Sequence, residues 1–394
     1  MATAILDLDL HHLPPEIAGL GRYHRALVLV RQRGQPVGQA ILPVVDGGID
    51  GAGLRDALMA AADEALREHW LHDIVSWDEV QTGGFEPRPA TVAVCTRDRP
   101  GALRRCLDAL MRLPDDGQDV LVVDNCPSSD ATRRLVAGYE RVRYVREERP
   151  GLNNARNRAL HEARHQVVAF TDDDAAPDAG WLRALLRNFE DPLVLCVTGL
   201  TMPLELETEA QEWFERYSPF NRGFKRTIFD RTNCNPLAAG RVGAGANMAL
   251  RRSLLEIIGP FDEALDAGTP TCSGGDTEIF SRILAAGYRI VYDPAALSWH
   301  HHRRTWQELL QTIYGYGVGV YALWTRRLLL EGNLGVLILA WGWFGHYQLP
   351  ALIRSILRRP GSPPLDMLLA ELQGCAMGPW AYFSSRRRRY QRSG

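Results

Sequence analysis

The stretch from Val167 to Asp174, V-V-A-F-T-D-D-D, constrains the fold more than any other part of the chain. Its apolar first half contains two β-branched valines and a phenylalanine, which predicts a short strand buried on both faces, as in a parallel sheet. Three carboxylates follow at once, and burying a carboxylate is costly unless it is paired, protonated or bound to a metal. We therefore expect these acids at the exposed carboxyl end of the strand, where open α/β sheets place their ligands.

The three acids, Asp172, Asp173 and Asp174, allow two interpretations. Asp172 and Asp174 lie two residues apart on an extended segment, so both can reach one hard divalent cation such as Mg²⁺ or Mn²⁺. Alternatively, the acids form a turn into a helix that begins near Trp181, with Asp178 as its N-cap. Because short motifs of this kind often arise by chance, the rest of the chain has to decide.

The composition is that of a soluble globular protein with more than one core. Of 394 residues, 46% are hydrophobic and 23% are charged. The formal net charge of -2 gives no reason to expect nucleic acid as a partner. The 7 cysteines are scattered without a C-x-x-C pair, which favours a reducing compartment over a disulfide framework or a zinc site. The N-terminus lacks a basic start followed by an apolar run, so we expect a cytoplasmic protein.

The first 88 residues predict a small α+β unit. Residues 24–45 read as a β-hairpin around the turn R-G-Q-P, and residues 54–70 carry apolar side chains at helical spacing. A unit of this size can fold semi-independently. It shows no chemistry of its own, so we expect an accessory or docking role.

From residue 89 onward, short apolar runs alternate with helical patterns. This alternation predicts an α/β fold with a mostly parallel, Rossmann-like sheet wound by right-handed crossovers and flanked by helices. The expected strands are 91–95, 120–123, 142–145 and 167–170, and the expected helices are 101–112, 130–139 and 153–162.

Polar residues follow strand after strand. Thr96, Arg97 and Asp98 come after the first strand, and Asp124 comes after the second. Together with the three acids after the fourth strand, they would gather at one edge of the sheet, which is what a nucleotide cleft requires.

The segment 151–158, G-L-N-N-A-R-N-R, predicts a helix N-terminus preceded by glycine. Backbone N–H groups, the helix dipole and the forked guanidinium of Arg156 would suit a diphosphate. The plainer interpretation is an exposed basic helix.

The segment 240–250, G-R-V-G-A-G-A-N-M-A-L, has side chains too small for a good helix. It suits a loop or strand whose backbone approaches a sugar closely, or equally a crossing that packs through small residues. Further on, Gly274 and Gly275 open a helix that runs to Ala286 and carries Asp276 and Glu278 in its first turn. Taken alone, both acids are ordinary first-turn residues favoured by the helix dipole.

The run His300-His301-His302-Arg303-Arg304 follows an expected strand at 288–292 and an expected turn at Asp293-Pro294. On an extended chain, alternate residues share a side, so His300 and His302 would face the same way.

The motifs end near Thr305. Residues 332–353 hold no Asp, Glu, Lys or Arg, but four glycines, His346, Gln348 and Pro350 argue against a spanning helix. An interfacial or packed helical hairpin fits better. With the basic tail formed by Arg386 to Arg389 and Arg392, this region favours either peripheral membrane contact on the inner face of the plasma membrane or a helical cap on the preceding domain.

The order of these parts, from Thr91 to about Trp306, resembles the family 2 glycosyltransferases of the GT-A fold, which are inverting enzymes that use nucleotide-diphosphate sugars. The matching segments are T-V-A-V-C-T-R-D-R-P, C-L-D-A-L, V-L-V-V-D-N, G-L-N-N-A-R-N-R-A-L, F-T-D-D-D-A-A-P-D-A-G-W-L, G-A-N-M-A-L-R-R, S-G-G-D-T-E-I-F and S-W-H-H-H-R-R. They are spread over a little more than half of the chain.

The resemblance implies a role for each matching residue. The predicted nucleotide-sugar site consists of Thr96, Arg97, Asp98, Asp124, Asn154, Arg156, Asp172, Asp173 and Asp174. In this set Asp124 reads the base, Asn154 and Arg156 flank the pyrophosphate, and Asp172-x-Asp174 is the D-x-D motif. The metal, Mn²⁺ or Mg²⁺, is implied on Asp174 and His300, with His302 as an alternative ligand and Arg303 or Arg304 steadying the diphosphate.

Asp276 matches the position of the catalytic base, and Gly275 stands where the family usually has a Glu. The implied acceptor and sugar pocket contains Gly245, Ala246, Asn247, Gly275 and Glu278.

The sequence thus predicts an accessory unit at 1–88, a glycosyltransferase domain at 89–306 and a helical region at 307–394. The expected reaction moves a sugar to a hydroxyl of a carbohydrate or lipid-linked acceptor, in the synthesis of a cell-envelope polysaccharide or glycolipid. One alternative is a sugar-1-phosphate nucleotidyltransferase, although T-R-D-R-P stands where that class has a glycine-rich loop. Another is a noncatalytic sugar-nucleotide-binding scaffold protein.

Overall fold

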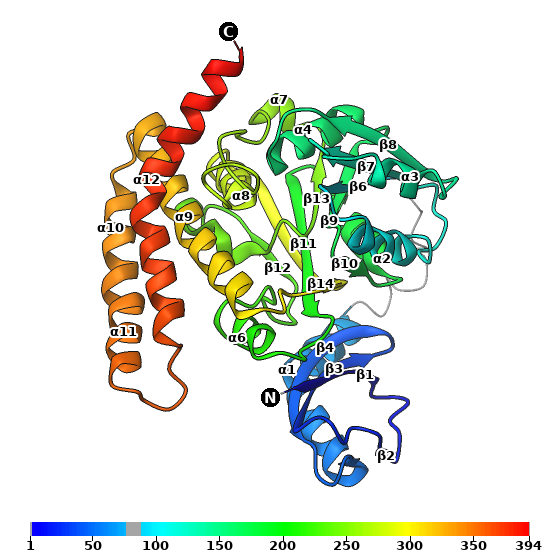
Figure 1. The fold of residues 1–394 in the computed structure, drawn as a ribbon. Coiled ribbons are helices and arrows are strands. Elements are labelled where there is room, and N and C mark those ends of the chain that lie inside the picture. Colours follow the sequence, from blue (N-terminus) through cyan, green and yellow to red (C-terminus); the bar gives the residue numbers. More distant parts are fainter. Residues whose placement is uncertain (1, 76–87, 394) are drawn as a thin grey trace.

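The computed structural model describes residues 2–75 and 88–393. Figure 1 shows a central sheet with helices on both faces, the N-terminal unit at one edge and a group of long C-terminal helices beside the sheet. This arrangement confirms the predicted fold class of a sheet flanked by helices, with an additional N-terminal unit and C-terminal helices. The boundary expected at residue 88 adjoins residues 76–87, which lie outside the described residues, and the division into three domains stays a prediction.

The central sheet has nine described strands in the order β10-β14-β11-β13-β9-β6-β7-β8, with β12 paired to β14. The strands are β6 (Thr91–Thr96), β7 (Asp119–Asn125), β8 (Val142–Glu147), β9 (Val167–Asp172), β10 (Ala175–Pro177), β11 (Val194–Pro203), β12 (Thr227–Phe229), β13 (Asn247–Arg251) and β14 (Arg289–His300). The half that runs from β9 to β8 is parallel, as predicted. The other half is mixed, because β13 pairs antiparallel to both β9 and β11.

Helices cover both faces of the sheet. Within the described residues they are α2 (Pro100–Leu110), α3 (Ala131–Val136), α4 (Leu152–Glu162), α5 (Trp181–Leu186), α6 (Glu209–Tyr217), α7 (Leu254–Ile257) and α8 (Gly275–Ala285). One buried cluster joins the sheet to α4 and α8, and a second joins its other face to α2 and α5. Apolar residues on both faces of the strands are buried under the helices, so a ligand cannot bind to either face. The polar residues at the carboxyl ends of the strands mark the edge where a ligand can bind.

Two local predictions were wrong. The turn expected at Asp293-Pro294 lies inside β14, where an irregularity in the pairing with β11 accommodates a proline that has no N–H to donate. The expected N-cap, Asp178, lies three residues before the first residue of α5, and Gly180 takes the N-cap position. The Asp178 side chain instead accepts hydrogen bonds from the Gly180 N–H at 3.2 Å and from Arg31 at 2.8 Å.

The N-terminal unit contains β1 (Thr3–Asp9), β2 (Glu16–Ile17), β3 (Arg25–Gln32), β4 (Gln35–Pro43), β5 (Ile49–Asp50) and α1 (Gly51–Val75). The predicted hairpin is confirmed as β3 and β4, and α1 is the predicted helix. Thr3 donates its N–H to the Leu206 carbonyl at 2.8 Å, and Leu27 and Leu29 join the large core of the central sheet. The unit is therefore packed against the central sheet.

The C-terminal region is a bundle of long helices: α9 (Trp306–Glu331), α10 (Gly335–Trp343), a π-helical turn (Phe344–Gln348), α11 (Leu349–Ile356) and α12 (Leu365–Ser393). Glycines let the helices α9 and α12 approach closely. A Cβ at Gly317 would lie 2.4 Å from the Glu371 carbonyl oxygen, and a Cβ at Gly374 would lie 2.1 Å from the Tyr314 carbonyl oxygen. Within the described residues, the continuous helix 335–356 is the one long and apolar enough to cross a bilayer. Side chains of the basic tail beyond residue 387 lie outside the described residues.

Candidate active site

A cavity of about 900 Å³ opens at the carboxyl ends of the parallel strands. It is bounded by α6, α8, α9 and the loops after β6 and β9. The predicted site residues that line it are Thr96, Arg97, Arg156, Asp172, Asp173, Asp174, Gly245, Ala246, Asp276, His300 and His302. The structure therefore brings most of the predicted donor site together with Asp276.

Asp173 and Asp174 of the acid run are buried and bridged by an arginine that the sequence did not single out. Arg99 donates to Asp173 and to Asp174, each at 2.6 Å, and Thr96 donates to Asp173 at 2.7 Å. Burial raises the pKa of Asp173 to about 7, with a further contribution from neighbouring Asp174. Burial opposes ionisation of Asp174 as well, but His300 and Arg99 outweigh it and hold the pKa of Asp174 well below its usual range. Solvated acids in a surface turn would not need such partners, so the simple turn interpretation does not fit.

Asp172, Asp174 and His300 form a candidate cation site. One ligand atom from each residue lies within 4.8 Å of the other two. Among the described residues, no other group of three or more His, Cys, Asp or Glu side chains comes this close together. Strand pairing builds it: Ala175, directly after the acid run, pairs with His300, the last residue of β14. Two carboxylates and an imidazole are a suitable set for Mn²⁺ and leave positions for phosphate oxygens.

His302 does not serve as an alternative ligand here, since both of its ring nitrogens are engaged. Its Nδ1 lies 3.1 Å from His300 Nδ1, and its Nε2 lies 3.2 Å from Glu215 Oε2. If a cation binds His300 through Nε2, the ring proton must sit on Nδ1 and point to His302. His302 must then carry its own proton on Nε2, and Glu215 accepts it. Glu215 on α6 thus sets the tautomer of both rings.

Replacing Glu215 by Leu is expected to weaken Mn²⁺ binding roughly 10- to 100-fold, the usual cost of losing a partner of a ligand. Glu215→Gln should lose much less, because its amide oxygen can still accept from His302 Nε2. Titration of Mn²⁺ into each purified variant, followed by calorimetry, checks this. Equal affinities for the Leu and Gln variants would contradict the tautomer argument.

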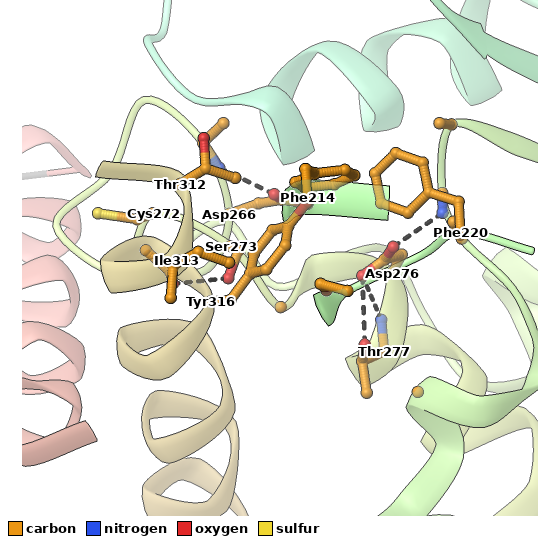
Figure 2. Close-up of a pocket in the computed structure, with 18 of the residues that line it drawn as sticks. Phe214, Phe220, Asp266, Cys272, Ser273, Asp276, Thr277, Thr312, Ile313 and Tyr316 are labelled. Atoms are coloured by element: carbon orange, nitrogen blue, oxygen red, sulfur yellow. Dashed lines mark hydrogen bonds between the residues drawn. The ribbon is translucent and has the colours of Figure 1, made fainter. Parts of the chain in front are cut away.

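Asp276 lies in the first turn of α8 and faces the cavity (Figure 2). Its Oδ2 accepts the Gly245 N–H at 2.8 Å, and its Oδ1 accepts the Thr277 N–H at 2.6 Å. A side chain at position 245 would collide, because a Cβ there would lie 2.7 Å from Arg156 Nη2 and 2.9 Å from Asp276 Cβ. The backbone approach expected of the small-residue segment therefore serves to fix a carboxylate.

The residue that faces Arg156 is Asp266, which the sequence did not reveal. Arg156 is buried and pairs with Asp266 Oδ2 at 2.5 Å. A Cβ on Gly275 would lie 2.3 Å from the same oxygen, so Asp266 occupies the space in which a side chain at position 275 would begin. This explains why Gly275 replaces the Glu that the family resemblance leads one to expect. Asp266 has a φ of 85°, a conformation that a non-glycine residue adopts at a cost and that often marks functional sites.

Six predicted site residues do not line the cavity: Asp98, Asp124, Asn154, Asn247, Gly275 and Glu278. Glu278 is fully buried and pairs with Arg282 at 2.7 Å and Arg326 at 3.1 Å, which leaves no free carboxylate for an acceptor. Asn247 holds the core together, since it accepts from Trp181 Nε1 at 2.7 Å and donates to two backbone carbonyls.

Apart from Gly275, which has no side chain, the other three have hydrogen-bond partners outside the cavity. Asp98 accepts from the Ser128 N–H and hydroxyl, both at 2.8 Å. Asp124 accepts from the Tyr144 hydroxyl at 2.9 Å, and its buried Oδ1 has no partner among the described residues. The Asn154 amide donates to the Pro150 carbonyl at 3.0 Å.

Aromatic side chains from α6, from the segment after it and from α9 line the cavity beside Asp276 and the histidines. Figure 2 shows Phe214, Phe220 and Tyr316 around the space in front of Asp276. Phe220 also packs against the ring of His300, with centroids 5.1 Å apart. Flat apolar surfaces of this kind suit the face of a sugar ring.

The sequence profile of the family described as "Glycosyl transferase family 2" matches residues 91–259. That range holds β6 to β9, the acid run and Arg156. Residues 91–259 belong to glycosyl transferase family 2. The match ends before Asp266, Asp276 and His300, which complete the site from the following segment.

Proteins named as glycosyltransferases resemble the chain over the same region. It is 29% identical over 249 residues to the pre-mycofactocin glycosyltransferase of Mycobacterium tuberculosis, covering 62% of this chain and 49% of that protein. It is 24% identical over 205 residues to the O-antigen chain rhamnosyltransferase RfbN of Salmonella typhimurium, covering 51% of this chain and 62% of that protein. The chain thus spans about half to three fifths of these relatives.

Among solved structures, the mannosyltransferase PcManGT of Pyrobaculum calidifontis, in complex with GDP-Man and Mn²⁺, aligns with a TM-score of 0.46. The alignment has 19% identity and covers 81% of this chain and 80% of that one.

Proposed function

We propose that the protein is an inverting glycosyltransferase that moves a sugar from a nucleoside-diphosphate sugar to an acceptor hydroxyl. The observation that carries this proposal is the position of Asp276, whose fixed carboxylate faces the same cavity as Arg156 and the Asp172, Asp174 and His300 cluster. A base and a site for a departing diphosphate are what a single displacement at the anomeric carbon needs.

The donor diphosphate binds at the acid and arginine end of the cavity. Asp172, Asp174 and His300 would hold a divalent cation, Mn²⁺ or Mg²⁺. When bound, the cation supplies electrostatic stabilisation of the charge on the leaving nucleoside diphosphate. Arg99 and Arg303 lie beside Asp174, at 2.6 and 3.2 Å, and line the cavity, so both guanidinium groups are placed to bind phosphate oxygens.

Asp276 removes the proton from the acceptor hydroxyl as that oxygen attacks. Hydrogen bonds from the Gly245 N–H to Oδ2, and from the Thr277 N–H and hydroxyl to Oδ1, hold the carboxylate in place. One lone pair on Oδ2 remains for the substrate. Attack from the side opposite the leaving group inverts the anomeric configuration. The family 2 relatives include an O-antigen chain enzyme, which supports a product in a cell-envelope polysaccharide or glycolipid.

A thermal-shift screen against UDP, GDP, TDP, CDP and ADP, each with Mn²⁺, Mg²⁺ or EDTA, tests the donor site. A ligand at about a hundredfold over its Kd should stabilise the protein by roughly 2.7 kcal/mol. We expect one diphosphate to raise Tm with a metal and to lose that effect in EDTA. The absence of a shift with every nucleotide would contradict the proposal.

Product analysis separates the remaining candidates. A noncatalytic scaffold would bind the nucleotide without releasing nucleoside diphosphate, and a nucleotidyltransferase would release pyrophosphate instead. We expect nucleoside diphosphate together with a glycosylated acceptor of inverted configuration, which NMR of the anomeric proton distinguishes.

A further inference from the structure

The C-terminal helices expose an apolar surface that the proposed reaction does not explain. On the helix 335–356 the most exposed side chains are Trp341 at 77% and Ile338 at 76%, and on α12 it is Trp380 at 64%. The other large apolar residues exposed here are Leu334, Leu337, Phe344, Tyr347, Leu349, Ile353, Ile356, Leu357, Leu365, Leu369, Met377 and Phe383. We call this set the apolar helical surface. Soluble monomers rarely expose so many large apolar residues together unless the surface binds something.

Positive charge predominates around this surface, since the flanking acids are engaged: Glu331 pairs with Arg327, and Asp366 accepts from Trp306 Nε1. Residues 332–365 contain no Asp or Glu, and their charged residues are Arg354, Arg358 and Arg359. All three are exposed and none forms an ion pair within the described part of the chain. Arginines beside exposed Trp and Leu side chains are complementary to a bilayer that carries anionic head groups. In Figure 1 these helices lie on the outside of the molecule, beside the central sheet.

The catalytic cavity reaches this surface. Beyond Asp276 its wall continues along α9 through Ile313, Tyr316 and Val320. It then continues on the outer helix, where Tyr347 and Arg354 both line the cavity and are exposed to solvent. One continuous space therefore joins the proposed base to the apolar helical surface, and its far part is lined by aromatic and aliphatic side chains together with Gln348, Arg354 and Glu371.

We propose that the apolar helical surface docks on an anionic lipid bilayer and that the acceptor is an amphipathic, lipid-linked alcohol or glycan drawn from it. The apolar part of the acceptor lies between α9 and the helix 335–356, and its hydroxyl reaches Asp276. The identity of the acceptor rests on the glycosyl transfer proposed above, whereas bilayer docking does not. The helix 335–356 contacts α12 through Gln348 and Cys375 and is joined to it by residues 357–364, which include Arg358 and Arg359. We therefore expect docking to be peripheral, without a spanning helix.

Vesicle flotation of the full chain tests the docking. We expect recovery with phosphatidylcholine vesicles that contain phosphatidylglycerol, little recovery with phosphatidylcholine alone, and a loss at high salt. The double variant Trp341→Glu and Trp380→Glu should lower the bound fraction roughly tenfold, because each change places a charge on the apolar face. Ile41→Glu is the matched control, since Ile41 is 63% exposed on β4 in the N-terminal unit, and it should float as the unchanged protein does.

Several results would overturn the proposal. They are equal recovery of the double variant, no recovery with anionic vesicles, resistance to alkaline carbonate extraction, or a stable dimer in sedimentation that the double variant abolishes. Thermal shifts with nucleoside diphosphates, measured on the same samples, keep this test separate from the function. Loss of flotation with the nucleotide shift intact rejects bilayer docking alone, whereas flotation without any nucleotide shift rejects the glycosyl transfer and with it the acceptor.

Discussion

Asp276→Asn is expected to lower kcat roughly 10²- to 10⁴-fold, the range that general-base catalysis usually contributes. The Asn amide has one oxygen and one NH2 group, so it keeps the hydrogen bond from only one of the Gly245 and Thr277 N–H groups, because these donate to different carboxylate oxygens. The substitution therefore removes the ability to take a proton together with one of the two backbone hydrogen bonds to this side chain. The measurement is steady-state turnover of the donor identified by the thermal-shift screen.

Two comparisons make this result specific. Nucleotide binding by Asp276→Asn should match that of the unchanged protein, because the diphosphate end of the cavity is untouched. Asp108→Asn, a change at an exposed residue of α2 that binds Tyr139 at 2.7 Å, should leave kcat unaltered. A turnover within twofold of normal for Asp276→Asn would assign the base to another residue.

Asp174→Asn is expected to abolish the metal-dependent part of nucleotide binding and to lower kcat roughly 10²- to 10³-fold, as for loss of one electrostatic stabiliser of a leaving group. The carboxylate accepts from Arg99 and lies 3.2 Å from His300, so its loss removes one negative ligand and frees a cationic guanidinium. Mn²⁺ titration and turnover over a range of Mn²⁺ concentrations measure both effects.

Asp116→Asn is the matched control for this substitution. Asp116 also pairs with an arginine, Arg183, at 2.6 Å, but it lies outside the cavity lining. It should change neither metal affinity nor turnover. If Asp174→Asn kept full activity in EDTA, the cation would have no part in the reaction.

The sequence revealed those parts of the site in which the chemistry lies in one short segment. In three places a change in the hydrophobic pattern marks the end of a strand or the start of a helix. They are the acid run at the end of β9, Arg156 near the start of α4 and Asp276 near the start of α8. Pairing of β10 with β14 then brings His300 to the acids. The order of strands alone could predict that these ends meet at one edge of the sheet.

The residues that the sequence missed have signals of another kind. Glu215 lies on an ordinary amphipathic helix, and it reaches His302 across 87 positions. Asp266 reaches Arg156 across 110. No local pattern marks such pairs, because only tertiary packing brings them together.

The erroneous role for Glu278 has a simple geometric cause. Residues two apart on a helix differ by about 200° in direction. Asp276 and Glu278 therefore cannot face one cavity, and when the first points to the substrate space the second points into the core. Here Arg282 and Arg326 neutralise it.

The site is divided along the chain at residue 259, where the family match ends. Asp172, Asp174 and Arg156 come before that point, and Asp266, Asp276 and His300 come after it. Neither segment on its own contains both the groups for the diphosphate and the base. A chimaera could exchange the residues beyond 259 between two relatives. We expect it to inherit its donor nucleotide from one parent and its choice of acceptor from the other. The contact between Arg156 and Asp266 joins the two segments, so these two residues must come from a matched pair.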